Sequence, residues 1–313
     1  MANPLYDRLF AVHAGRTDTF LHLASGGALS YADFLALAAR IANALSAAGL
    51  APGDRLAAQV EKSPEALALY AACAQAGLVF LPLNTAYTVE ELSYFIGNSG
   101  ARLVVCDPGR QAALAPVAAG LGARIETLDA HGGGSLMAAA AEMPPSFEAV
   151  ARTEDDLAGL LYTSGTTGRS KGAMLSQGNL LSNALTLAEC WRFTGEDVLL
   201  HALPIFHTHG LFVATNVMLA VGGAMIFLPK FEADAVIGWL PEATAMMGVP
   251  TFYTRLLDDP RFTRELVAHM RLFVSGSAPL LAETHRRFEA RTGHRILERY
   301  GMTETNMNTS NPY

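Results

Sequence analysis

Charged side chains are scarce in this sequence: Asp, Glu, Lys and Arg make up only 16% of its 313 residues, against 51% hydrophobic residues. Such a composition excludes a disordered chain and favours a globular protein with well-covered β-sheets. Acidic residues outnumber basic ones by 29 to 22, which gives a net charge of -7. The chain therefore lacks the basic excess of a nucleic-acid-binding protein, and any anionic ligand must be held by a few local cations.

Cysteine is also rare, and the three cysteines are far apart and match no metal-ligand spacing. Buried thiols in a reducing compartment are therefore expected rather than disulfides. No secretory leader is expected either, because Asp7, Arg8 and Arg16 interrupt any apolar run near the start of the sequence. These features predict a cytoplasmic protein.

No hydrophobic run is long enough to require a membrane span. The apolar run 211–228 comes nearest, since the stretch 198–229 holds no Asp, Glu, Lys or Arg. Thr215, Asn216 and the glycine pair at 222–223 interrupt that run. We therefore predict a buried helix, a glycine turn and a buried strand there, and no transmembrane helix.

Apolar runs of strand length alternate with amphipathic segments of helix length along the chain. The clearest helix is predicted at 30–49, where four large apolar side chains recur at helical spacing. The alternation predicts an α/β fold with parallel-rich sheets covered by helices. We expect two such sheets facing one another, in sub-domains of residues 1–156 and 157–313.

One segment contains more glycine and hydroxyl groups than a packed core can use. Residues 162–172 read YTSGTTGRSKG and link two predicted strands. The glycines let main-chain N–H groups approach an anion, the hydroxyls are further donors, and Lys171 supplies a mobile positive charge. The segment is thus predicted to bind phosphate. The residues expected to contact it are Thr163, Ser164, Gly165, Thr166, Thr167, Gly168 and Lys171.

Two other interpretations of this segment are weaker. A Walker A loop has four residues between its glycines, whereas here Gly168 precedes Lys171 by only three positions and Gly172 follows the lysine. A flexible linker also favours glycine and serine, but it needs no buried strand on either side.

Three further segments follow the loop: PIFHTHG at 204–210, SGSAP at 275–279 and ERYGMTE at 298–304. Together with the loop, and in this order, they resemble the signature motifs of the adenylate-forming superfamily. That superfamily includes acyl-CoA synthetases, luciferases and peptide-synthetase adenylation domains. Ser170 is the one departure in the loop, because the family usually has proline there. The run 298–312 is similar to malonyl-CoA synthetases in particular.

The resemblance implies an ATP-dependent acid:CoA ligase that uses ATP, Mg²⁺ and coenzyme A. Such an enzyme would adenylate malonate or a close dicarboxylate, release pyrophosphate and then form malonyl-CoA. The family alternative is a short- or medium-chain fatty acid:CoA ligase. A peptide-synthetase adenylation domain is disfavoured, because no carrier domain is visible.

The resemblance also implies roles for individual residues. The loop and Lys171 would hold the β- and γ-phosphates, Tyr300 would stack on adenine, Thr303 would contact the α-phosphate and Glu304 would ligate Mg²⁺. The catalytic residues expected in this way are Lys171, His207, Thr303 and Glu304. The nucleotide-binding residues expected outside the loop are Gly276, Ser277, Ala278, Glu298, Tyr300, Gly301, Met302 and Thr303.

A substrate with a second carboxylate needs a cation in the acyl pocket, because burying that carboxylate unpaired is costly. The segment 248–255 ends a predicted strand and opens a helix that, by resemblance, lines this pocket. Arg255 is therefore the expected partner, and the alternative is that Arg255 forms a surface ion pair with Asp258 or Asp259. The other residues expected to contact the acid are His207, Ser277 and Met302.

The resemblance also implies a domain that this sequence does not include. Members of the superfamily continue beyond the 298–304 motif into a small carboxy-terminal domain with a catalytic lysine, whereas this sequence ends at Tyr313. We therefore expect a fragment or a truncated chain without that domain. A non-catalytic fragment that binds nucleotide or acyl groups is the alternative function.

Overall fold

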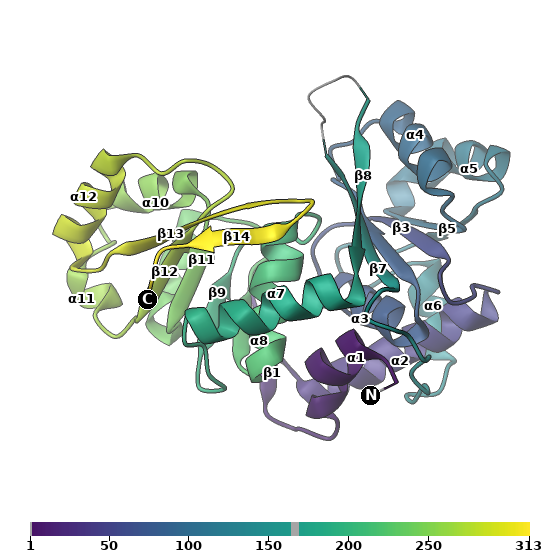
Figure 1. Ribbon diagram of the computed structural model, residues 1–313, viewed down its shortest axis with the longest axis horizontal. Coiled ribbons are helices and arrows are strands. Elements are labelled where there is room, and N and C mark those ends of the chain that lie inside the picture. Colours follow the sequence, from purple (N-terminus) through teal and green to yellow (C-terminus); the bar gives the residue numbers. More distant parts are fainter. Residues whose placement is uncertain (1, 164–168) are drawn as a thin grey trace. The chain divides into compact units, whose positions relative to one another are not determined.

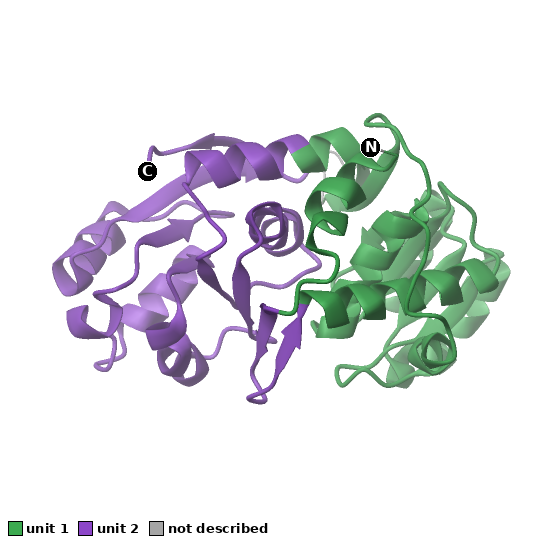
Figure 2. Ribbon diagram, turned by 90° about the horizontal axis from the view of Figure 1, so that it is seen from below, with its two compact units in different colours: residues 1–17, 31–181 green, residues 18–30, 182–313 purple. Residues whose placement is uncertain are grey.

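The computed structural model describes residues 2–163 and 169–313 (Figure 1). The chain divides into two compact units, coloured green and purple in Figure 2. Unit 1 comprises Met1–Thr17 and Tyr31–Leu181, and unit 2 comprises Asp18–Ser30 and Ser182–Tyr313. Each unit contains one parallel-rich sheet with helices, so the predicted α/β class is confirmed.

Unit 1 is built on a six-stranded sheet, counted over the described residues, with the order β6-β5-β3-β4-β7-β8. Neighbouring strands are parallel except β7 and β8, which are antiparallel. Strands β4 and β5 are buried over their whole length, as expected of parallel strands covered on both faces. The strands are β3 (Arg55–Gln59), β4 (Val79–Pro82), β5 (Leu103–Cys106), β6 (Arg124–Thr127), β7 (Leu157–Thr163) and β8 (Lys171–Ser176).

Local signals set the ends of the helices in unit 1. Helix α3 begins after Ser63, whose hydroxyl accepts from the N–H of Ala66, and it ends at Gly77 in the left-handed conformation. Helix α4 begins with a capping box between Thr88 and Glu91. The α-helices are α1 (Pro4–Leu9), α2 (Tyr31–Ala47), α3 (Pro64–Ala76), α4 (Val89–Ser99), α5 (Gln111–Gly120) and α6 (Ser135–Ala141). Helix α2 is the one predicted at 30–49.

Unit 2 is built on an eight-stranded sheet, again over the described residues, with the order β14-β13-β12-β11-β9-β10-β1-β2. The strands from β13 to β1 run parallel, and β2 and β14 pair antiparallel at the two edges. The strands are β1 (Thr19–Leu23), β2 (Ala28–Ser30), β9 (Val198–His201), β10 (Ala224–Phe227), β11 (Ala245–Gly248), β12 (Leu272–Ser275), β13 (Ile296–Met302) and β14 (Asn306–Ser310).

Helices pack against this second sheet. They are α8 (Asn216–Val221), α9 (Ala233–Trp239), α10 (Pro250–Leu257), α11 (Arg264–Val267) and α12 (Ala282–Thr292). Apolar side chains of α9, α10, α11 and α12 join a core with inner residues of β9, β10, β11 and β12, and this core buries Tyr253, Phe273 and Phe288. Helix α7 (Gln177–Cys190) begins in unit 1 and ends in unit 2.

The apolar run 211–228 forms the helix, glycine turn and strand predicted for it. A π-helical segment, His209–Thr215, leads into α8, and Gly222 ends that helix with a φ of 74° before strand β10 begins. Gly222 can adopt this left-handed conformation because it has no Cβ. Within the described residues, no helix is long and apolar enough to cross a membrane.

The compact units do not coincide with the sub-domains 1–156 and 157–313. The β7–β8 hairpin belongs to unit 1, because β7 pairs with β4. Residues 18–30 belong to unit 2, because β1 pairs with β10 more than 200 residues later. Both differences arise from strand pairing between distant segments, which periodicity along the chain does not reveal.

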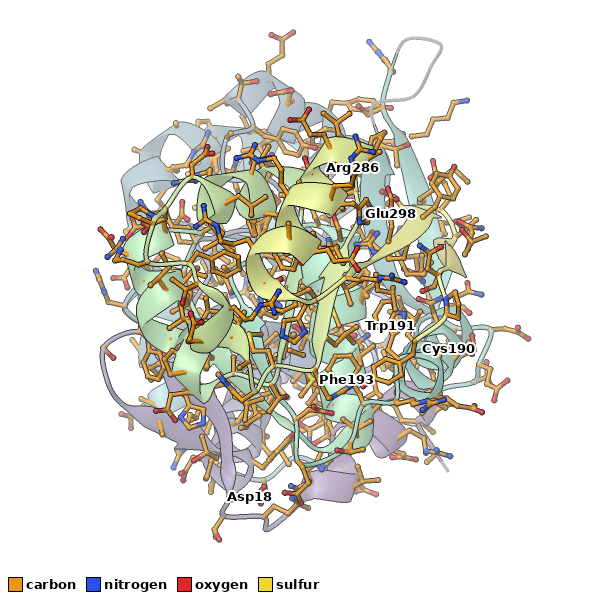
Figure 3. The ribbon with its side chains drawn as sticks, turned by 90° about the vertical axis from the view of Figure 1, so that its left-hand side faces the viewer. Asp18, Cys190, Trp191, Phe193, Arg286 and Glu298 are labelled. Atoms are coloured by element: carbon orange, nitrogen blue, oxygen red, sulfur yellow. The ribbon has the colours of Figure 1, made fainter. Side chains whose placement is uncertain are left out.

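Helix α7 and the residue that follows it, Trp191, anchor the hairpin of β13 and β14. The indole N–H of Trp191 donates to Oγ of Ser310 at 2.8 Å, and Nδ2 of Asn183 donates to the carbonyl of Met307 at 3.1 Å. Trp191 is fully buried, and its ring centroid lies 6.5 Å from that of Phe193 (Figure 3). These contacts fix the hairpin that carries the 298–304 motif.

Candidate nucleotide and acid site

The predicted phosphate loop connects the two antiparallel strands that the sequence led us to expect. Thr163 at the end of β7 lies opposite Lys171 at the start of β8, and Lys171 is exposed. The structure thus places the lysine where a ligand can reach it. Five residues of the predicted phosphate contact lie outside the described residues: Ser164, Gly165, Thr166, Thr167 and Gly168.

Helix α4 holds the segment that follows the loop. The hydroxyl of Tyr94 donates to the carbonyl of Ser170 at 2.8 Å, and the guanidinium of Arg169 lies 5.5 Å from the centre of the Tyr94 ring. The Tyr94 ring in turn packs against Tyr162 on β7, with centroids 6.0 Å apart. Tyr94 therefore links both strands of the hairpin to α4.

The other three motifs line two cavities in unit 2. The first has a volume of about 460 Å³ and is lined by 277–279, 298–301 and 309–311. The second has a volume of about 440 Å³, and its lining includes 207–210, 301–303 and Val249. Ser277, Arg299 and Gly301 line both. Motifs far apart in sequence therefore meet at the carboxyl ends of β9, β11 and β12, where ligands bind in open α/β sheets.

Most of the predicted residues of unit 2 line these cavities. Ser277, Ala278, Glu298, Tyr300 and Gly301 line the first cavity, and His207, Ser277, Gly301, Met302 and Thr303 line the second. The Tyr300 side chain is 58% exposed, so one face of its ring is accessible for stacking. Glu304 lies in the exposed turn between β13 and β14 and lines neither cavity as the described residues form them.

Glu298 has a structural role as well. One carboxylate oxygen accepts a hydrogen bond from the N–H of Leu280 at 3.1 Å, and the other lies 3.6 Å from Nε2 of His285 on α12. Figure 3 shows Glu298 on β13 and Arg286 on the neighbouring helix α12. The carboxylate thus fastens the segment between β12 and α12, which includes Ser277 and Ala278.

Ser277 and His209 form a polar pair at the second cavity. Oγ of Ser277 lies 3.2 Å from Nδ1 of His209, whereas the buried Nε2 of His209 has no hydrogen-bond partner within residues 2–163 and 169–313. Ser277 has a φ of 71°, which is unusual for a residue with a side chain and is typical of functional sites. Burial holds the pKa of His209 well below its usual value, and the positive charge of Arg299 adds to this effect. The ring is therefore neutral at pH 7.

Arg299 is a residue that the sequence interpretation missed. Its side chain is only 5% exposed, and among the described residues neither Nε nor Nη2 has a hydrogen-bond partner. Burial lowers the pKa of the guanidinium to about 10, so it is still charged at pH 7. A buried cation with unsatisfied donors beside a cavity is incomplete without an anion. The signal was available, since Arg299 follows the inward-facing Leu297 by two residues on the same strand.

Arg255 does not lie where the sequence interpretation placed it. It is exposed, lines neither cavity, and its guanidinium lies 4.7 Å from the centre of the Phe231 ring. The reason is helical geometry: Tyr253 faces the core on α10, and a residue two positions later points to the opposite side. The alternative ion pairs are not formed either, because Asp258 and Asp259 pair with Arg287 and Arg261.

Comparison with known proteins identifies the class. The family "AMP-binding enzyme" matches residues 10–313, and the chain therefore belongs to this family. The resemblance to adenylate-forming enzymes inferred from the four motifs is confirmed.

Individual relatives are more specific. The chain is 36% identical over 281 residues to a feruloyl-CoA synthase from an Amycolatopsis species, covering 89% of this chain and 55% of that protein. It is 38% identical over 259 residues to a mitochondrial malonate–CoA ligase from Mus musculus, covering 75% of this chain and 43% of that protein. The chain thus spans about half the length of the curated relatives it matches.

A solved structure matches the whole chain. The crystal structure of ATP-bound MatB from Rhodopseudomonas palustris superposes with a TM-score of 0.97 at 59% sequence identity. The match covers 100% of this chain and 62% of that one. The similarity to malonyl-CoA synthetases expected from residues 298–312 is confirmed by the malonate–CoA ligase relatives.

Proposed function

We propose that this chain supplies the nucleotide and acid site of an ATP-dependent malonate:CoA ligase. The enzyme would join malonate, or a close dicarboxylate, to AMP with release of pyrophosphate and then transfer the acyl group to coenzyme A. Family membership, the ATP-bound MatB structure and the malonate–CoA ligase relatives support this proposal. No role for nucleic acid is proposed, in keeping with the net charge of -7.

The buried side chain of Arg299 is the observation that supports a dicarboxylate as the acid substrate. Its Nε and Nη2 face no acceptor in the part of the chain that the structure describes, and the residue borders both cavities. A guanidinium can bind a carboxylate through two parallel hydrogen bonds, which a monocarboxylic acid bound by its reacting end cannot supply here. We therefore assign to Arg299, rather than to Arg255, the second carboxylate of the substrate.

The first reaction needs positioning and positive charge more than proton transfer. A carboxylate is already ionised at pH 7, so its oxygen can attack the α-phosphorus directly while the bond to pyrophosphate breaks. Thr303 borders the second cavity and is proposed to contact the α-phosphate, and Tyr300 is proposed to stack on adenine. Lys171 and the loop donors would neutralise the departing phosphates. The neutral ring of His209 and the rim residue His207 would orient the acid.

The residues fit a magnesium ion that is held mainly by the nucleotide. Among the described residues, no cluster of three or more His, Cys, Asp or Glu side chains could hold a metal ion by itself. Mg²⁺ typically binds one or two carboxylates together with phosphate oxygens and water, and the exposed Glu304 suits that role. When bound, the ion would offset negative charge on the leaving pyrophosphate.

A monocarboxylate ligase and a non-catalytic fragment are the alternatives. The first would leave Arg299 buried without a counter-charge in the enzyme–substrate complex, which is costly. The second predicts nucleotide binding without acid-dependent chemistry. Exchange of labelled pyrophosphate into ATP separates all three.

The exchange experiment compares malonate, acetate and butyrate at matched concentrations in the full-length protein. Malonate should support exchange far better than the monocarboxylates, and Arg299→Ala should remove this preference. If ATP binds but no acid supports exchange, the enzyme proposal is wrong. If butyrate is preferred to malonate, a fatty acid:CoA ligase is the better assignment.

A reducing compartment such as the cytoplasm is proposed for this protein. Cys73, Cys106 and Cys190 are free thiols, as in proteins of reducing compartments. Cys73 and Cys106 are buried as expected, whereas the expectation was wrong for Cys190, which is exposed. Several malonate–CoA ligase relatives are by name mitochondrial, so this proposal concerns the redox environment first. Fractionation of the source cells with a thiol-labelling reagent would test it.

A further inference from the structure

Gly276, the residue that follows β12, lies beside Arg299 on β13. β12 and β13 run parallel, with Ser275 opposite Glu298, so the next pair in the same register is Gly276 and Arg299. Side chains at directly opposite positions of a sheet point to the same face. The long side chain of Arg299 therefore extends across the position where Gly276 has none.

The space beside Gly276 is filled by the guanidinium itself. A Cβ built on Gly276 would lie 2.3 Å from Cζ of Arg299, 2.4 Å from Nε and 2.5 Å from Nη1. Contacts this short do not occur between a Cβ and a heavy atom to which it is not bonded. The observed position of the guanidinium therefore requires a glycine at 276.

We propose that Gly276 is a positioning residue for acid selection, because its missing side chain provides the space in which the Arg299 guanidinium meets the second carboxylate of the substrate. This inference rests on the proposed role of Arg299. It also changes the expected role of Gly276: the residue lines neither cavity, and it acts through its neighbour rather than by contact with adenine.

The backbone at Gly276 would accept a side chain. Its φ lies outside the left-handed region, so alanine is not excluded by backbone conformation. The conflicting atoms are the end of a flexible side chain that borders two cavities, so Arg299 has room to move. Gly276→Ala should therefore leave the protein folded and displace the guanidinium.

The test is a double-mutant cycle with Gly276→Ala, Arg299→Ala and the combined variant. Gly238→Ala is the matched control, because a Cβ there meets no atom within 4 Å. Two quantities are measured for each protein: the malonate-to-acetate ratio of kcat/KM in pyrophosphate exchange, and malonate binding by titration calorimetry. Melting temperature reports on folding.

Gly276→Ala should lower the malonate-to-acetate ratio by about 10- to 100-fold, as expected when a charge-assisted contact is lost. Malonate binding should weaken in parallel, while the melting temperature hardly changes. In the Arg299→Ala background, the same substitution should change the ratio by less than about twofold. Gly238→Ala should change neither quantity.

Each other outcome has a definite meaning. If Gly276→Ala fails to fold but the combined variant folds, removal of the Arg299 side chain has restored stability. That result demonstrates the conflict between the alanine Cβ and the guanidinium. If neither folds, the space serves another structural purpose and the inference is wrong. It is also wrong if Arg299→Ala loses malonate selectivity and Gly276→Ala keeps it. If Arg299→Ala keeps full malonate selectivity, the proposed role of Arg299 is wrong, and the inference about Gly276 that rests on it is wrong as well.

Discussion

Oγ of Ser277 lies 3.2 Å from Nδ1 of His209, although the two residues are 68 positions apart in sequence. The pair joins the end of β12 to the segment after β9 at the wall of the second cavity. The buried ring of His209 stays neutral because burial opposes its protonation. The pair is thus a hydrogen bond between neutral groups and has a predictable response to pH.

Acidification should destabilise the protein through His209. Below a pH of about 6.5 the unfolded histidine binds a proton that the folded one excludes, so stability rises with pH in this range. The free energy of unfolding should therefore fall between pH 7 and pH 5. Urea unfolding at the two pH values measures it.

His209→Gln should remove most of that pH dependence, and His131→Gln, at an exposed position, should leave it unchanged. An unaltered slope in His209→Gln would mean that the ring is protonated in the folded state.

Replacing Arg299 by methionine should stabilise the free protein. Burial lowers the pKa of the guanidinium to about 10, so below pH 10 the folded state carries a penalty that the unfolded state avoids. Stability should therefore increase by about 1–3 kcal/mol at pH 7 in Arg299→Met. Thermal and urea unfolding measure the change, with the exposed Arg255→Met as control.

Malonate should raise the melting temperature of the original protein but not that of Arg299→Met. A loss of several kcal/mol in Arg299→Met would instead show that the guanidinium supports the fold.

Lys171→Ala should impair ATP binding far more than folding. The lysine is exposed at the start of β8, so it contributes little to packing, whereas a charge-assisted contact with phosphate is worth about 1.5–3 kcal/mol. ATP affinity should fall by about 10- to 150-fold, while the melting temperature hardly changes. Titration calorimetry and thermal unfolding give both values. Lys230→Ala is the control, since Lys230 is also exposed. A large loss of stability with unchanged ATP affinity would assign a structural role to Lys171.

Asp197→Ala should destabilise unit 2 strongly. The carboxylate accepts from Nε and Nη2 of Arg271, each at 2.6 Å, and from the N–H of Thr194 and the hydroxyl of Thr244. Removing it leaves the partly buried Arg271 without its counter-charge, at a cost of about 3–5 kcal/mol. Urea unfolding measures the loss.

The matched control is Asp234→Ala. The Asp234 side chain is 87% exposed in its pair with Arg261, so its loss should cost less than about 1 kcal/mol.

Burial raises the pKa of Asp197, but the hydrogen bonds to its carboxylate outweigh this effect, so the pKa is lowered overall. The stabilisation is therefore present above the ordinary carboxylate pKa and is lost as pH falls through the lowered value. Equal losses in the two variants would contradict the role of the buried pair.

Local chemistry made much of the fold predictable. The apolar spacing of 30–49 and the capping residues of α3 and α4 act over a few positions, so the helices could be recognised without knowing their neighbours. The strands on either side of the phosphate loop were predictable for the same reason. Strand pairing was not, because β1 reaches β10 across most of the chain. The boundary at 156/157 was therefore placed differently from the compact units.

The sequence by itself determined the α/β class and the membership of the AMP-binding family, because both depend on residue types in a fixed local order. Only the tertiary structure decided which arginine borders the cavities. Arg255 and Arg299 both lie in motifs near predicted strand ends, and they differ in which face of the element they occupy. That face is set by packing of α10 on the core and by the register of β13 beside β12, where a glycine leaves room for the guanidinium.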